Sequence, residues 1–269
     1  MNRKVAVVMS FYSNDKVGFL KESVRSIFEQ QNVDVHLYIV QDGPCSKDLI
    51  SSIELDSNIT MMANLRNEGL AFCLNRAIDR VISDDDCDYI ARMDADDISV
   101  SNRFSEQVNF LDNNNDIDVV GSDVWEIDNN GAKKFYKKMD SSHQELLKNI
   151  IVKCPFNHPT VMFRKSVFKE GLRYKASLKN TQDYYLWVDL LSAGKKIANI
   201  NEPLVLFRVD ENFHKRRGLK KAINDLNSRL YAFKYLDCFC FRNVFHTFML
   251  VVLRLLPSFL KKIAYKYFR

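Results

Sequence analysis

Short apolar segments and longer segments with helical spacing alternate over most of this 269-residue chain. The segments with the composition of buried strands are residues 5–10, 33–42, 59–64, 88–97, 117–128, 159–165 and 197–209. The segments with the spacing of amphipathic helices are residues 19–30, 68–82, 103–114, 141–152 and 181–194. Strands separated by helices predict an α/β fold with a parallel or mixed sheet and helices on both faces. Pro159 and Pro203 predict loops at the entry to the last two strands.

Length and composition limit the class of protein. A chain of this size forms one large domain, or one domain with an appendage, and its 46% hydrophobic content excludes a disordered chain. The six cysteines form no C-x-x-C pair, which favours reduced thiols in a cytoplasmic protein. The first apolar run, Val5 to Met9, is too short for the core of a signal peptide and predicts a strand.

Charge is distributed unevenly along the chain. Residues 215–269 carry 13 Lys and Arg against 2 Asp, a net charge of +11, whereas the other 214 residues carry 26 basic against 32 acidic side chains, a net charge of −6. The basic part is rich in Phe, Leu and Tyr, but its apolar run is shorter than the roughly 18 residues of a spanning helix. We expect residues 214–269 to form a basic amphipathic helical extension on an anionic membrane surface, with no nucleic-acid partner. The alternative is that this segment packs on the domain core or forms a homodimer.

An acidic sequence, Asp94-Ala95-Asp96-Asp97, follows directly after the apolar strand 89–93. Residues i and i+2 of an extended segment project to one side, so Asp94 and Asp96 can reach one cation at the strand's carboxyl end. Open α/β sheets bind ligands at that edge, and Mg²⁺ and Mn²⁺ prefer carboxylate and phosphate oxygens. The motif indicates a nucleotide–metal site. The alternative is a set of turn acids in which Asp97 caps the helix that begins near Ser101.

Other polar residues stand at predicted strand or helix ends. Asp42 precedes a Gly-Pro turn, where it can bind a nucleobase or ribose or cap the turn itself. Arg66 lies in a polar loop that opens a helix, where it can neutralise a diphosphate together with the helix dipole. Asp183 stands at a helix start as a general base or as a partner of the helix dipole. His158 and His214 are isolated histidines, for which a structural role is the commoner one.

Taken in order, seven segments resemble those of glycosyltransferase family 2, the inverting nucleotide-sugar transferases. They are VVMSFYS, IVQDGP, NLRNEGLAFCLNRAI, YIARMDADDIS, IDVVGS, NHPTVMFRKSV and QDYYLWVDLLSAG. The similarity is greatest to bacterial enzymes that extend O-antigen and other surface-polysaccharide units on a lipid carrier. It implies the GT-A fold, a Rossmann-like nucleotide-binding mixed sheet flanked by helices. The catalytic domain would span 1–213, with a nucleotide-sugar half over about 1–128 and an acceptor half over about 129–213.

The resemblance also implies roles for individual residues. The positions expected to bind the nucleotide sugar are Ser10, Phe11, Tyr12, Asp42, Arg66, Asn67, Arg92, Asp94 and Asp96. Asp94 and Asp96 match the family's D-x-D motif and would bind Mn²⁺ or Mg²⁺, with Asp96 as the direct ligand. Asp183 matches the family's catalytic base. The chain departs from the family at Gln41 and Gln182, where members often carry an acidic residue.

The activity implied by the resemblance is transfer of a hexose or N-acetylhexosamine from a nucleotide sugar, by family habit a UDP-sugar. The acceptor would be an undecaprenyl-diphosphate-linked saccharide at the inner face of the cell membrane, where the enzyme would be peripheral. A single displacement would invert the configuration and give a β-linkage, for which we take β-1,3 as the working assignment. Two alternatives come from other classes: a nucleotidyltransferase acting on sugar phosphates, and a non-catalytic sugar- or lipid-binding module.

Overall fold

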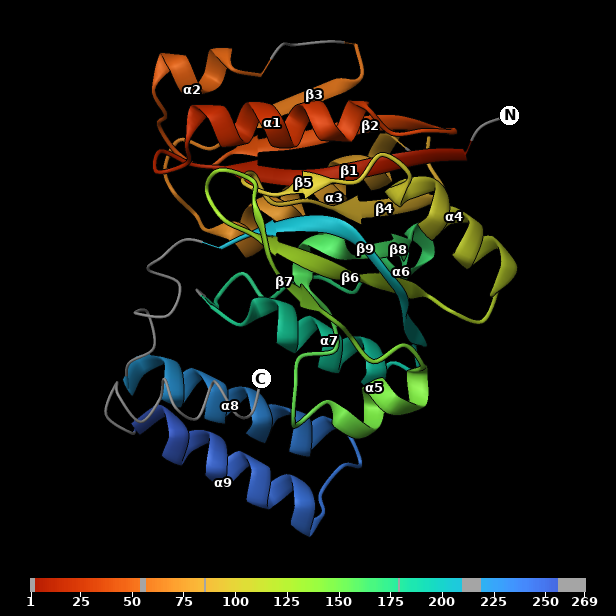
Figure 1. Cartoon of the computed structure of the whole chain (residues 1–269), viewed down its shortest axis with the longest axis vertical. Helices are drawn as coiled ribbons and strands as arrows, with labels where there is room; N and C mark the ends of the chain where they lie inside the picture. Colours follow the sequence, from red (N-terminus) through yellow and green to blue (C-terminus); the bar gives the residue numbers. More distant parts are fainter. Residues whose placement is uncertain (1–2, 54–56, 85, 179, 210–218, 256–269) are drawn as a thin grey trace.

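The computed structural model describes residues 3–53, 57–84, 86–178, 180–209 and 219–255. Within them a nine-stranded mixed sheet has the order β3-β2-β1-β4-β8-β6-β9-β5, with β7 paired to β6 (Figure 1). The strands are β1 (Arg3–Phe11), β2 (Val33–Gln41), β3 (Ile59–Ala63), β4 (Tyr89–Arg92), β5 (Ile98–Ser99), β6 (Val119–Ile127), β7 (Lys133–Lys137), β8 (Met162–Arg164) and β9 (Ile197–Arg208). The mixed sheet flanked by helices confirms the predicted fold class.

Helices cover both faces of this sheet because side chains along each strand alternate in direction. On β1, Val5, Val7 and Met9 join one core with α1, α2 and α4, whereas Ala6 and Val8 join a second core with α3, α6 and α7. The helices are α1 (Val17–Phe28), α2 (Lys47–Ser51), α3 (Leu70–Asp84), α4 (Arg103–Asn113), α5 (His143–Asn149), α6 (Lys165–Lys169), α7 (Gln182–Ser192), α8 (Leu219–Tyr235) and α9 (Phe241–Leu255), with a 3₁₀ turn η1 (His158–Thr160).

The parallel part of the sheet sets the position of the functional site. β1 pairs in parallel with β2 on one side and with β4 on the other, and the next strand, β8, runs antiparallel to β4. The chain therefore leaves β1 toward one edge and returns at its other side, which creates a switch point between β1 and β4. The loops that follow β1, β2 and β4 meet at this carboxyl edge.

Pro203 lies inside a strand and not in the predicted loop. The sequence predicts a loop there, but β9 continues through Pro203, and its pairing with β6 shifts register around Asp123. Pro lacks an N–H group for the sheet ladder, and a bulge is where a strand tolerates that loss.

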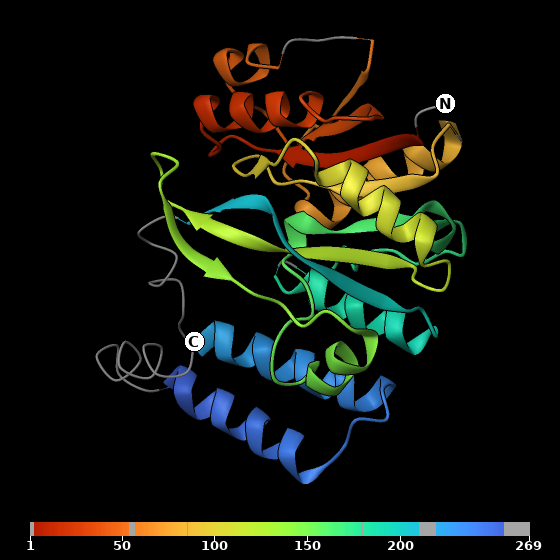
Figure 2. The ribbon, with the colours of Figure 1, turned by 45° about the vertical axis from the view of Figure 1, so that its right-hand side comes forward.

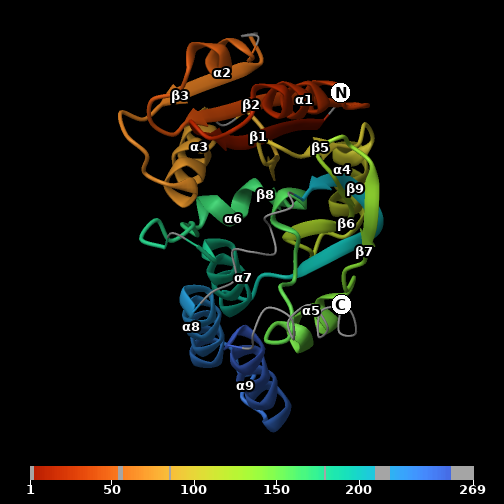
Figure 3. The ribbon, with the colours of Figure 1, turned by 60° about the vertical axis from the view of Figure 1, so that its left-hand side comes forward.

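The carboxyl-terminal helices stack beneath α7 and α5, at the end of the molecule opposite β3 (Figures 2 and 3). Ala232 of α8 and Leu236, directly after that helix, are buried in the same core as α7, and α9 packs on α8. α8 thus closes the domain core, which was the alternative for this segment. None of the helices that the structure describes is long and apolar enough to cross a membrane. His214, Pro257 and the basic residues 261–269 lie outside the described ranges.

A tight contact in β6 provides a test of this packing. A Cβ atom on Gly121 would lie 2.4 Å from Asn199 Oδ1 and 2.5 Å from Phe156 Cδ1, so Gly121→Ala should lower the free energy of unfolding by ~1–3 kcal/mol. Gly18→Ala, on α1 with open space around it, is the control and should be neutral or slightly stabilising. Urea denaturation measures both, and equal midpoints for the two variants would contradict the packing described.

Candidate active site

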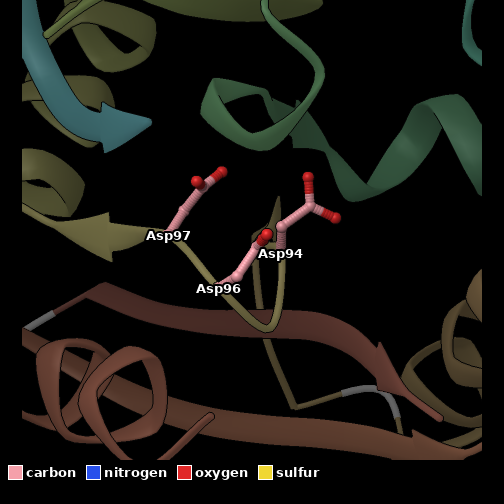
Figure 4. A group of neighbouring side chains, drawn as sticks. All are labelled: Asp94, Asp96 and Asp97. Carbon is pink, nitrogen blue, oxygen red and sulfur yellow. The ribbon is translucent and has the colours of Figure 1, made fainter. Parts of the chain in front are cut away.

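Three carboxylates gather in the loop that joins β4 to β5. Oxygen atoms of Asp94, Asp96 and Asp97 lie within 4.8 Å of one another, and the side chains project to the same side of the loop (Figure 4). Asp94 is half-buried, Asp96 is exposed and Asp97 is buried. The loop thus brings Asp94 and Asp96 together, as the alternation along an extended segment predicts, and it adds Asp97 to them.

Arg92 forms a bidentate ion pair with Asp94. Its Nη1 lies 2.5 Å from Asp94 Oδ2, and its Nη2 contacts Oδ1. Arg92 is 1% exposed, so its guanidinium is not presented to a ligand. The predicted direct contact of Arg92 with the nucleotide sugar therefore does not fit, and Arg92 instead fixes the carboxylate of Asp94. Of the two D-x-D acids, Asp96 is left with the more accessible oxygens.

Asp97 links the acidic loop to the end of β9. Its Oδ1 accepts a hydrogen bond of 2.7 Å from the main-chain N–H of Arg208. Its buried Oδ2 has no hydrogen-bond partner among the described residues. The alternative interpretation, in which Asp97 caps α4, is wrong, because Asn102 is the N-cap residue of that helix.

The acidic cluster fits a hard divalent cation. Burial, together with Asp94 and Asp96, raises the pKa of Asp97, and loss of hydration, with repulsion from Asp94 and Asp15, raises the pKa of Asp96 to about 6. The neighbouring carboxylates also concentrate negative charge, which a cation would relieve. Carboxylate oxygens, one of them buried without a partner, are the ligands that Mg²⁺ and Mn²⁺ prefer.

Arg208 holds the acidic loop from behind. Its guanidinium donates to the Asp96 carbonyl at 2.8 Å, to two carbonyls of the 128–129 turn at 3.1 Å and to Glu22 Oε2 at 2.7 Å. The guanidinium also stacks on the ring of Phe19, 4.0 Å from its centroid. One buried side chain thereby ties together the D-x-D loop, the β6–β7 turn and α1.

The loop after β1 faces the same cluster. Ser10 is half-buried and Tyr12 is exposed at this edge, but Phe11 packs in the core with Met9 and so does not lie beside a nucleotide. Asp15 accepts a hydrogen bond from the Tyr12 N–H at 2.8 Å. Burial and repulsion from Asp94 raise the pKa of Asp15 to about 6, although the hydrogen bond from Tyr12 lowers it. Asp15 is thus a fourth acid near the cluster.

Asp42 organises the loop that follows β3. Its carboxylate accepts hydrogen bonds from Asn64 Nδ2 at 3.1 Å, from the Glu68 N–H at 2.8 Å and from the Gly69 N–H at 2.9 Å. Asp42 is buried, and both of its oxygens already have donors within the protein. Asp42 thus fixes the start of α3, and its contact with a nucleobase stays a prediction.

Arg66 and Asn67 stand on the loop that Asp42 holds. The Arg66 side chain is 82% exposed and pairs with Glu68 at 2.7 Å, so it is accessible to an anionic ligand. Asn67 approaches the turn after β2 so closely that a Cβ on Gly43 would lie 2.8 Å from its main-chain nitrogen. Gly43 has a φ of +85°, a second reason why glycine is required there.

Asp183 lies in the first turn of α7, on the other half of the fold. The residue before that helix, Thr181, adopts φ 63°, and the neighbouring Gln182 is buried with an Oε1 that has no partner in the described structure. The charges of both Asp183 and Asp94 act on the hydroxyl of Tyr174. Tyr174 therefore lies within electrostatic range of both the acidic cluster and the predicted base.

His158 serves a structural role. Its Nε2 lies 2.9 Å from the hydroxyl of Tyr174, and its ring packs edge-on against Trp187. Burial and the nearby charge of Arg92 hold the pKa of His158 well below its usual value, so the ring is neutral. This agrees with the structural role that is the commoner one for an isolated histidine.

Three residues of the site are missing from the sequence-based set: Asp15, Tyr174 and Arg208. Asp15 follows a predicted strand by a few residues, and that position at the carboxyl edge is a signal that sequence can provide. Tyr174 and Arg208 carry no such signal, because their partners come from other parts of the chain.

The family model that matches this chain is that of glycosyl transferase family 2, over residues 6–172. The chain belongs to this family. An Escherichia coli protein named UDP-Gal:alpha-D-GlcNAc-diphosphoundecaprenol beta-1,3-galactosyltransferase is 30% identical over 98% of this chain and 95% of its own. The E. coli O-antigen biosynthesis glycosyltransferase WbnJ is 31% identical over 81% of this chain and 83% of its own.

Solved structures support the GT-A fold of this family 2 glycosyltransferase. Staphylococcus aureus TarS 1–349 with UDP-GlcNAc superposes with a TM-score of 0.61 at 15% identity, covering 87% of this chain and 72% of that chain. The mannosyltransferase PcManGT of Pyrobaculum calidifontis with GDP-Man and Mn²⁺ gives a TM-score of 0.65 at 12% identity, over 87% and 65%. The chain spans 43% of the length of the longer TarS chain. At these identities the likeness concerns the fold alone.

Arg208→Lys tests whether this arginine positions the D-x-D loop of the glycosyltransferase. Lysine keeps the charge but cannot bind the Asp96 carbonyl, the 128–129 turn and Glu22 together. We expect the affinity for Mn²⁺, measured by calorimetry with UDP present, to fall by ~10–100-fold, the usual effect of removing a support behind a metal ligand.

The control for this variant is Arg164→Lys. Arg164 also donates to three main-chain carbonyls, and none of them belongs to the acidic loop. It should lower stability and leave Mn²⁺ affinity unchanged. An unchanged Mn²⁺ affinity in Arg208→Lys would overturn the positioning role.

Proposed function

We propose that this glycosyltransferase is inverting and metal-dependent, and that it moves a hexose or N-acetylhexosamine from a UDP-sugar to a lipid-diphosphate-linked saccharide. The acidic cluster after β4 carries this proposal, because its negative charge suits a divalent cation, which would in turn bind a nucleoside diphosphate at the carboxyl edge of the parallel strands. Support for the acceptor class comes from the E. coli relative, whose name specifies a GlcNAc-diphosphoundecaprenol acceptor. We assign the activity to bacterial surface-polysaccharide synthesis, such as O-antigen, at the cytoplasmic face of the membrane.

Donor binding would use two sides of the carboxyl edge. Asp96 would be the main metal ligand, because Arg92 already binds both oxygens of Asp94. A bound Mn²⁺ or Mg²⁺ would neutralise the negative charge of the diphosphate. Arg66, exposed on the loop that Asp42 holds, would reach the nucleotide from the other side. We assign Ser10, Tyr12 and Asn67 to the same nucleotide surface.

Asp183 would act as general base on the acceptor. Its carboxylate would accept the proton of the acceptor hydroxyl while that oxygen attacks the anomeric carbon of the donor. The bond between that carbon and the diphosphate oxygen breaks as the new bond forms, and the nucleoside diphosphate leaves. Attack opposite to the leaving group inverts the configuration, so an α-linked donor gives a β-glycoside. The relative's name makes UDP-Gal the first donor to test and β-1,3 the first linkage.

The reaction itself is tested by release of nucleoside diphosphate. Purified full-length protein is supplied with UDP- and GDP-sugars, Mn²⁺ or EDTA, and a synthetic lipid-diphosphate-GlcNAc acceptor. We expect one UDP-sugar to release UDP only when acceptor and metal are both present. The metal would stabilise the diphosphate leaving group, and the acceptor supplies the attacking hydroxyl. Release of pyrophosphate would instead identify a nucleotidyltransferase. Donor binding without any turnover across a broad acceptor panel would identify a binding module.

Asp183→Asn tests the assignment of the base. Asparagine keeps the shape but cannot accept a proton, so transfer should fall by ~10²–10⁴-fold while UDP-sugar affinity stays unchanged. Single-turnover kinetics and calorimetry measure the two quantities. Asp189→Asn, on the same helix and bound to Tyr231 at 2.6 Å, controls for loss of an α7 carboxylate and should retain turnover. Near-normal turnover in Asp183→Asn would exclude this residue as the base.

A further inference from the structure

The first half of α9 has its polar and apolar sides reversed relative to an ordinary surface helix. Asn243 and Thr247, at 5% and 7% exposure, face the protein. Phe241, Phe245 and Phe248 are 87%, 51% and 63% exposed. A helix that covers a domain normally buries its apolar stripe against the core. α9 instead presents its apolar stripe outward.

Polar contacts fix this orientation. Asn243 Nδ2 donates to the Cys238 carbonyl at 2.8 Å, which ties the buried face of α9 to the end of the preceding turn. Arg242 donates to the carbonyl of Lys148 at 3.2 Å and to Asn149 Oδ1 at 2.8 Å, which ties the start of α9 to α5. The Asn243 bond fixes the buried polar side, and the exposed Arg242 anchors the start of the helix, so the outward direction of the phenylalanines is part of the fold.

The exposed stripe is continuous along two turns of the helix. We define the outer face of α9 as Phe241, Val244, Phe245 and Phe248, which recur at intervals of three and four residues and are all exposed. The rings of Phe241 and Phe245 stack with centroids 6.4 Å apart. Phe239, 75% exposed in the turn before α9, extends the same run of aromatic residues. Contiguous apolar surface of this kind marks a site of contact with another body.

Charge decides which body fits. The outer face belongs to the segment 215–269, whose net charge is +11, and the exposed side chains of Lys234 and Arg242 lie on α8 and α9 themselves. Contact of this face with the same face of a second copy would bring two strongly basic segments together. An anionic lipid surface offers the complementary charge and an apolar layer for the rings.

We propose that the outer face of α9 inserts into the interfacial layer of an anionic membrane, with the aromatic rings at the level of the acyl chains and the basic side chains among the headgroups. The inference deepens the proposed function, on which it rests for the need to reach a lipid-linked acceptor. It names the surface that meets the bilayer: α8 closes the core, and α9 makes the contact.

The test compares two full-length double variants in vesicle co-sedimentation. Phe245→Asp with Phe248→Asp removes the centre of the outer face and should lower affinity for phosphatidylglycerol-containing vesicles by at least about tenfold. Phe28→Asp with Phe72→Asp removes two exposed rings from α1 and α3 and should bind vesicles like the wild type. Binding should also weaken in vesicles of phosphatidylcholine alone. Equal affinity of the two double variants for anionic vesicles would overturn the proposal.

Two further readouts separate the alternatives. If the wild type is dimeric by light scattering without lipid, and the α9 variant is monomeric with unchanged vesicle binding, the face is a subunit interface and the proposal is wrong. The α9 variant should keep wild-type turnover on a short-chain, water-soluble acceptor. Absence of turnover in every protein would count against the proposed function, whereas loss of vesicle binding confined to the α9 variant would still support the membrane face.

Discussion

Repulsion among the carboxylates of Asp94, Asp96 and Asp97 is the constraint around which this site is built. Three acids within 4.8 Å are unfavourable unless neighbouring groups hold them, and the fold provides those groups from the end of β4 and from the end of β9. Arg92 neutralises Asp94, and the end of β9 binds both Asp97 and the Asp96 carbonyl. The charge that remains is concentrated on the exposed side of the loop. The electrostatic free energy of bringing three carboxylates together is offset by the ion pair with Arg92 and the hydrogen bonds from Arg208.

The same contacts explain how two halves of the fold serve one site. The parallel strands β1, β2, β3 and β4 bring the acidic loop, the Asp15 loop and the Asp42-bound loop to one edge. The second half contributes α7 with Asp183, and buried Tyr174 lies within electrostatic range of both Asp183 and Asp94. β9 couples the halves, because it pairs with β6 along its length and ends in Arg208 beside the acidic loop. The carboxyl-terminal helices have different roles: α8 completes the core, whereas α9 exposes its aromatic side chains.

Much of this arrangement is predictable from sequence. The alternation of strand and helix patterns predicts the α/β class and the longer elements of the catalytic domain, because periodicity reports which side of an element is buried. The short elements α2, β5, β7 and α6, of two to five residues, are not predicted. The spacing in Asp94-Ala95-Asp96-Asp97 predicts neighbouring carboxylates for a local reason, the geometry of an extended chain. Predictions failed where burial, or a contact between separate elements, decides the role of a residue. Arg92 is buried and binds Asp94 instead of a ligand, Phe11 packs in the core, and Asp97 binds Arg208 instead of capping α4.

The sequence by itself determined the family, the order of the longer elements, the acidic loop and the basic character of the last 55 residues, because each of these depends on local pattern or composition. Only the tertiary structure decided which acids keep accessible oxygens, that Arg208 and Tyr174 belong to the site, and which side of α9 faces outward. These depend on contacts between residues such as Asp97 and Arg208, 111 positions apart, or Arg242 and Asn149, 93 positions apart. Hydrogen bonding and burial across such separations have no local signature, so the folded chain alone reveals them.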